Sequence, residues 1–161
     1  MGAGASLLAQ EDLETYQLLT HFSRHTILHL HSRFLQMADP GSKRARGAEV
    51  AVRQEVVVRQ EVVVARLAEF RANPFAARLC RVFSESEEVM VFEEFLDMLS
   101  SLSLGSSVEA RAMWAFRTFD YDGDGLLGRE DVRRVVDAVT GTDMAALSSE
   151  LREKVVSHVL E

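Results

Sequence analysis

A closely spaced run of acidic residues constrains this chain more than any other feature of its sequence. Asp120, Asp122 and Asp124 occupy alternate positions and are followed directly by Gly125. Carboxylates held so close together repel one another unless a cation lies between them. Oxygen ligands at alternate positions, with glycine where the chain must turn sharply, are typical of a twelve-residue loop that binds a divalent ion between two helices. The sequence therefore predicts a helix–loop–helix metal site.

The later loop positions define the remaining ligands and the choice of ion. In the EF-hand scheme the aspartates fill positions one, three and five, and Leu126 offers its main-chain carbonyl at position seven. Gly128 at position nine has no side chain, so we expect water at that vertex. Asp131 at position twelve is one methylene shorter than the usual glutamate, which favours ligation through one oxygen. We therefore expect both Ca2+ and Mg2+ as cofactors, with less selectivity for Ca2+ than a glutamate-terminated loop shows.

Composition narrows the class of protein. The chain has 161 residues, of which 47% are hydrophobic, so it can bury a substantial core. A formal charge of −7 argues against a nucleic-acid partner, because phosphates would be repelled. The single cysteine, Cys80, lies in an apolar periodic segment and is expected in the core of a cytosolic protein. No nucleophile–base arrangement stands out, so we do not expect an enzyme.

The N-terminus carries a lipidation pattern. Gly2 follows the initiator methionine and Ser6 stands where the myristoylation motif requires serine or threonine. We expect residues 1–10 to form a flexible acylated segment that attaches the protein reversibly to the inner face of membranes. No apolar run approaches the roughly 20 residues of a membrane span, and no signal peptide is recognisable.

Apolar spacing predicts an all-α fold. We expect two helices within residues 11–38 with a break at 20–23, and a helix with Asn73 as N-cap that runs to Phe83. Further helices are predicted at residues 92–102, 108–119 and 129–139, and a last one is capped by Ser148 or Ser149.

A second helix–loop–helix precedes the acidic loop. Its loop, at residues 84–91, would place Phe83 at position one and Glu88 at position six, where a ligand and a glycine are needed. We expect this degenerate hand to bind no metal and to pair with the acidic loop through a short β-bridge between Met90 and Leu127.

A six-residue valine-rich unit repeats in tandem over residues 49–54, 55–60 and 61–66. Six residues rotate a helix by about 600°, so successive units would face different sides, whereas in a strand every unit presents the same faces. The β-branched valines favour a strand, and the charged residues between them suit a helix surface. The pattern therefore leaves a strand, a helix and a local expansion within a tolerant loop as open alternatives. The basic residues 42–48 before the repeat are expected to form a loop.

Three histidines, His21, His25 and His29, follow one another at intervals of four residues. On one face of a helix they could bind Zn2+, and the alternative is a solvated or partner-facing stripe.

Short segments along the whole chain match the pattern of one known family. They are Tyr16-Gln17 with Thr20, Ile27-Leu28, His31, Arg33-Phe34, Asn73-Pro74-Phe75, Arg81-Val82-Phe83-Ser84, Phe95-Leu96-Asp97 and Ala115-Phe116-Arg117. Together they resemble the calcium- and integrin-binding proteins, also called calmyrins. The resemblance covers about residues 1–160 apart from the valine repeat, and it implies four EF-hands, of which the first two are degenerate and the last two bind metal.

The resemblance also implies a domain organisation. Residues 11–83 would hold the N-terminal helices with the degenerate first hand, and residues 84–142 the paired second and third hands, the third at 107–142. Residues 147–161 would be the incoming helix of a fourth hand, whose loop and outgoing helix we expect to be missing.

Members of this family bind an amphipathic helix, such as an integrin α-subunit cytoplasmic tail, in a hydrophobic groove. The resemblance implies the same partner class here. An incomplete fourth hand would leave apolar residues uncovered, so we also expect weak self-association. A static Mg2+-bound subunit and a truncated, weakly competing product are the alternatives. The expected partner-binding residues are Met113, Phe116, Phe119, Val135 and Val136.

Overall fold

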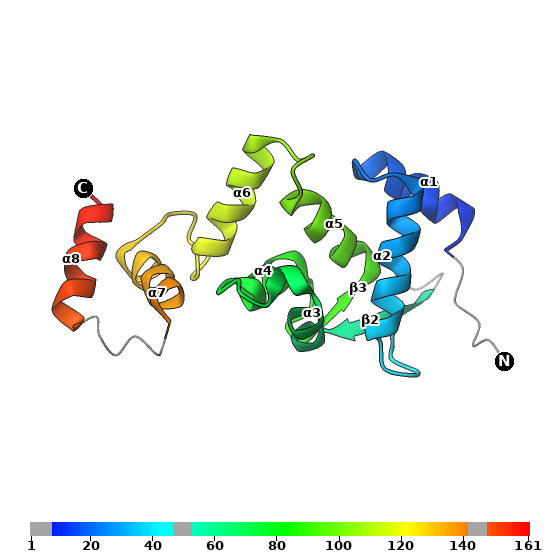
Figure 1. Cartoon of the computed structure of the whole chain (residues 1–161), viewed down its shortest axis with the longest axis horizontal. Helices are drawn as coiled ribbons and strands as arrows, with labels where there is room; N and C mark the ends of the chain where they lie inside the picture. The colour runs from blue at the N-terminus through cyan, green and yellow to red at the C-terminus, as the bar shows by residue number, and fades with distance from the viewer. Residues whose placement is uncertain (1–7, 47–52, 142–147) are drawn as a thin grey trace.

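The computed structural model describes residues 8–46, 53–141 and 148–161 and is mostly helical (Figure 1). The predicted all-α class is confirmed, with three short strands added to it. The elements are α1 (Gln10–Leu19), α2 (Arg24–Met37), β1 (Lys43–Arg46), β2 (Arg53–Arg59), α3 (Gln60–Arg66), a single 3-10 turn (Ala68–Phe70), α4 (Ala76–Phe83), β3 (Val89–Val91), α5 (Phe92–Leu102), α6 (Val108–Phe119), α7 (Arg129–Thr140) and α8 (Ser149–Val159).

Serine caps set the starts of three helices. The Ser23 hydroxyl accepts the Thr26 N–H at 3.2 Å, so α2 begins after the predicted break that separates it from α1. Ser107 caps α6 in the same way, and Ser148 caps α8. Such caps satisfy N–H groups that have no partner within the helix, which is why these boundaries can be read from sequence.

The predicted start of α4 is two residues too early. Asn73 does not act as the N-cap, because its side chain accepts the Phe75 N–H at 2.9 Å and its carbonyl accepts the Ala76 N–H at 3.1 Å. Pro74 and Phe75 therefore lie in a turn, and the helix begins at Ala76.

The β-strands join different partners from those predicted. β2 pairs antiparallel with β1 through residues 53–56 and with β3 through residues 57–59. Val58 is opposite Met90, so the expected bridge between Met90 and Leu127 is wrong. The prediction that residues 42–48 form a loop is also wrong, because β1 lies within them. β2 is thus joined to the loop of the second hand, and the acidic loop contributes no strand to this sheet.

The valine repeat adopts both of the conformations that the sequence left open. Its second unit lies in β2 and its third unit forms α3. The change occurs at Gln60, whose N–H donates to the Glu88 carbonyl at 2.9 Å and whose side-chain amide donates to the Ser86 carbonyl at 2.8 Å. These contacts with the loop of the second hand end the strand. The start of α3 is therefore set by tertiary contacts and not by the local sequence.

One hydrophobic core fills the N-terminal part of the molecule. It is built from α1 to α5 together with β2 and β3, and Phe34, Phe95, Met90 and Val58 are among its fully buried members. Cys80 is buried in it as predicted, and burial raises the pKa of its thiol to about 11. No helix among the described residues is long and apolar enough to cross a membrane.

Helices α6 to α8 extend away from this core, and α8 lies at the end of the molecule opposite α1 and α2 (Figure 1). α6 packs on the core through Trp114, whereas Met113 and Phe116, two of the expected partner-binding residues, are 49% and 36% exposed. α8 is held to α7 largely by charge, with Arg133 and Glu153 2.6 Å apart. Ion pairs this exposed stabilise little and weaken with salt.

The end of α5 is fastened to the turn between α1 and α2 through His21. His21 hydrogen-bonds to the Ser103 hydroxyl through Nε2 and to the Ser100 hydroxyl through Nδ1, the latter at 3.3 Å. His21 lies in the turn between α1 and α2, so it cannot share a helix face with His25 and His29 as the zinc hypothesis required. A Cβ added to Gly105 would lie 2.8 Å from the His21 Nε2 and closer still to its Cδ2.

We predict that Gly105→Ala lowers the free energy of unfolding by about 1–3 kcal/mol, because the added methyl group forces the imidazole away from both serines. Chemical denaturation measures this. The cost should shrink in a His21→Ala background, where no ring is displaced. Leu104→Ala is the control, since that side chain is 94% exposed. Equal costs in the two backgrounds would show that the contact is unimportant.

Candidate metal centre

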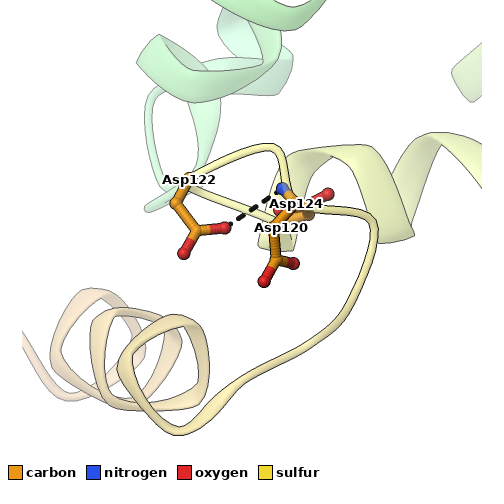
Figure 2. Close-up of side chains that lie close together, drawn as sticks. All are labelled: Asp120, Asp122 and Asp124. Carbon is orange, nitrogen blue, oxygen red and sulfur yellow. Dashed lines mark hydrogen bonds between the residues drawn. The ribbon is translucent and has the colours of Figure 1, made fainter.

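The acidic loop connects α6 to α7 and brings its three aspartates together. Single carboxylate oxygens of Asp120, Asp122 and Asp124 all lie within 4.8 Å of one another (Figure 2). Asp120 is buried, and the other two are exposed. This convergence is what the alternate spacing predicted.

Asp120 organises the turn of the loop. Its Oδ1 accepts the Gly123 N–H at 2.7 Å and its Oδ2 accepts the Gly125 N–H at 3.0 Å. Both glycines have left-handed backbones, with φ of 75° and 82°. Other residues adopt such angles only with strain, so the glycines let the chain fold around the Asp120 carboxylate. The loop is thus shaped by its first ligand.

Asp122 and Asp124 are held by shorter local turns. The Asp122 Oδ1 accepts the Asp124 N–H at 3.2 Å, drawn as the dashed line in Figure 2. The Asp124 Oδ1 accepts the Leu126 N–H at 2.7 Å. These bonds place part of the negative charge against N–H dipoles, which reduces the mutual repulsion of the carboxylates.

Asp131 is placed differently from the other predicted ligands. It is buried at the start of α7, outside the cluster of three carboxylates. Its Oδ1 accepts the Tyr121 N–H at 2.8 Å and its Oδ2 accepts the Gly128 N–H at 3.0 Å. The side chain therefore closes the loop by joining position two to position nine. The Leu126 side chain is exposed.

The residues present fit a hard divalent cation. Every side-chain donor of the cluster is a carboxylate oxygen, the ligand type that Ca2+ and Mg2+ prefer over nitrogen or sulfur. Each oxygen that accepts an N–H keeps further lone-pair capacity. The loop can therefore keep its shape while its carboxylates turn to an ion.

The second hand closes its loop without such a cluster. Glu94 takes the place of Asp131, and its two oxygens accept the N–H groups of Glu85 and Val91, each at 2.9 Å. In the described part of this loop no group of three potential ligand side chains converges. The sequence treated this hand only as degenerate and missed the closing role of Glu94, which its position twelve could have signalled.

The predicted partner-binding residues lie on neighbouring helices. Met113 and Phe116 are exposed on α6, and Val135 and Val136 are half-buried on α7. Phe119 is half-buried and its ring meets that of Phe75 at 5.1 Å. Gly2, the predicted acylation site, lies outside the described residues.

One charged residue near the loop was not found from the sequence. Arg78, on α4, donates to the main-chain carbonyls of Thr118 and Asp120. It is more than 40 positions from the loop in sequence and belongs to no motif, so nothing in its own segment pointed to the metal centre.

The helix–loop–helix with its aspartate cluster defines this as an EF-hand protein. The chain is 30% identical over 148 residues to calcium and integrin-binding family member 2 of Homo sapiens, covering 89% of this chain and 75% of that protein. It is 29% identical over 164 residues to the protein of that name from Drosophila melanogaster, covering 100% of this chain and 82% of the other. No protein-family model matches the chain. The chain belongs to the calcium and integrin-binding family.

We predict that Asp120→Ala abolishes divalent-ion binding, because the loop loses both a ligand and the acceptor for two glycine N–H groups. Calorimetric titration with Ca2+ provides the measurement. Glu130→Ala is the matched control: it removes one negative charge from the same loop, at an exposed residue that pairs with Arg133 instead of joining the cluster. Unchanged stoichiometry in Asp120→Ala would contradict the assignment.

Proposed function

We propose that this chain is an adaptor that binds Ca2+ or Mg2+ in its third hand and binds an amphipathic helix of a partner protein, such as an integrin α-subunit cytoplasmic tail. The observation that carries the proposal is the convergence of Asp120, Asp122 and Asp124. The relatives are named for calcium and integrin binding, which supports both halves of it.

The choice of ion depends on Asp131. A short carboxylate at position twelve favours the six-fold shell of Mg2+ over the larger shell of Ca2+. The side chain is already engaged with the N–H groups of Tyr121 and Gly128, which limits how far it can turn toward an ion. This supports a site used by both ions, and a permanently Mg2+-bound subunit is the second candidate.

We predict that Asp131→Glu raises the affinity for Ca2+ relative to Mg2+ by roughly tenfold, because the longer side chain restores two-oxygen ligation. Competition calorimetry with the two ions measures the ratio. Glu130→Asp is the matched control, as it changes the length of the adjacent exposed carboxylate. A shift of the ratio toward Mg2+ would refute this account of position twelve.

The partner surface is proposed on α6 to α8. Met113 and Phe116 lie three residues apart on α6 and so share one side of the helix. On α8, Val155 and Val159 are also exposed, and they are four residues apart. Apolar side chains at such spacing match the anchors of an amphipathic helix, and methionine adapts readily to different partners. Without a partner the same residues would favour weak self-association.

We predict that Phe116→Ala and Met113→Ala each weaken binding of an integrin α-tail peptide at least about fivefold, as expected for truncation of buried anchors. Calorimetry or fluorescence anisotropy measures the affinity. Leu18→Ala is the control, because that leucine is 87% exposed on α1, distant from α6 in the fold. Equal losses in all three variants would place the peptide elsewhere.

Membrane attachment through Gly2 is part of the same proposal, with the protein in the cytoplasm at the inner face of membranes. A single acyl chain gives only reversible binding, which suits an adaptor that meets the tail of a membrane protein. We predict that co-expression with an N-myristoyltransferase adds one acyl group, visible in the intact mass. Gly2→Ala should remove that increment, and an unmodified wild-type mass would rule out the site.

A further inference from the structure

The metal loop is tied to the N-terminal core along one line of contacts between α4 and α6. The Phe83 ring stacks on Trp114 with centroids 3.8 Å apart, and Phe75 meets Phe119 edge-on at 5.1 Å. Phe75 lies directly before α4 and Phe83 is its last residue, so Arg78 lies between the two aromatic pairs in the sequence. The α4 segment thus contacts α6 near its middle, at its end and at the first residue of the loop.

Arg78 binds the end of α6 through the main chain. Its Nη2 donates to the Asp120 carbonyl at 2.6 Å and its Nε donates to the Thr118 carbonyl at 3.3 Å. The last carbonyls of a helix have no partner within it and carry partial negative charge. The guanidinium satisfies them from a different helix, and so fixes the backbone of the residue that begins the loop.

The same guanidinium contacts the second residue of the loop. Arg78 lies 4.9 Å from the centroid of the Tyr121 ring, and Arg134 of α7 lies 5.3 Å from it. The Tyr121 N–H in turn donates to Asp131, which closes the loop. Tyr121 is therefore held by α4, by α7 and by the loop's last ligand position.

We propose that Arg78 is a positioning residue for the metal centre and the link through which ion binding acts on α4. It holds Asp120 and Tyr121 at the start of the loop without ligating the ion itself. Because linkage is reciprocal, an ion that favours one arrangement of Asp120 must also favour the matching arrangement of α4. This inference rests on the proposed function, since it requires that the loop bind a cation.

Two effects of Arg78 on ion affinity oppose each other. Its positive charge repels a cation, and its hydrogen bonds preorganise the first ligand residue. The described hydrogen bonds of Arg78 go to main-chain carbonyls and not to the loop carboxylates, whose oxygens stay available to an ion. Repulsion across a partly solvated site is strongly damped, whereas a hydrogen bond from a charged donor is a direct contact. Positioning therefore outweighs repulsion, and removing Arg78 weakens ion binding.

The test uses Arg78→Met and Arg78→Lys in the full chain, with Arg81→Met as the control. Arg81 is exposed on the same helix, so its removal changes the charge equally and leaves the loop contacts in place. Calorimetry gives the Ca2+ affinity. The emission of Trp114, the single tryptophan, reports the α4–α6 contact while Ca2+ is added. Circular dichroism confirms that each variant is folded.

Arg78→Met is expected to bind Ca2+ about tenfold more weakly, the loss of one charge-assisted hydrogen bond, and to lose the Ca2+-dependent change in Trp114 emission. Arg78→Lys keeps the charge but cannot span both carbonyls, so it should fall between wild type and Arg78→Met. If Arg78→Met does not fold, the Ca2+ affinity of Arg78→Lys alone still tests the role of Arg78. Arg81→Met should match wild type.

The failures are distinguishable. If the wild-type chain takes up neither Ca2+ nor Mg2+, the proposed function fails and this inference fails with it. If wild type binds Ca2+ and both Arg78 variants bind it equally or more tightly with the same emission change, the inference alone is overturned.

Discussion

The antiparallel pairing of β2 with β3 is the interaction on which the arrangement of this molecule depends. Val58 and Met90 are opposite each other in the register and are both almost completely buried, so the sheet and the core form together. The pairing joins β2, which leads directly into α3, to the loop of the second hand, so backbone hydrogen bonds and apolar burial hold these segments in one body. The third hand is attached to this body where α6 packs against α4 and α5.

The metal loop is already shaped by its own carboxylates. Asp120, Asp122 and Asp124 each accept main-chain N–H groups, and Asp131 joins the two sides of the loop. Binding an ion to such a loop orders little additional chain, so more of the electrostatic gain remains available as affinity. The degenerate second hand uses Glu94 in the same closing role, which indicates that closure and ligation are separable duties of position twelve.

Local signals were sufficient for most of the helices and for the shape of the acidic loop, but not for α3 or for the start of α4. Serine caps, apolar spacing and the Asp-x-Asp-x-Asp-Gly pattern act within a few residues, so the structures that they favour can be predicted from the sequence alone. The expected Met90–Leu127 bridge failed because strand pairing is a choice among distant partners, and β2 was hidden in the valine repeat. The exposure of Met113 and Phe116 could not be predicted from spacing alone, because amphipathic spacing identifies an apolar face but not what covers it. Arg78 could not be predicted from its own segment, because the main-chain atoms that it contacts are distant in sequence.

The tetrapeptide Glu-Val-Val-Val occurs twice in a row, in β2 at residues 55–58 and in α3 at residues 61–64, with two different secondary structures. Because six is even, a shift of the strand by one unit would return valines to the same face of β2. The Gln60 contacts with Ser86 and Glu88 oppose such a shift, because they hold one glutamine of the repeat at the loop of the second hand. The register of β2 is therefore set by the loop that its last residue meets, and not by the repeated valines.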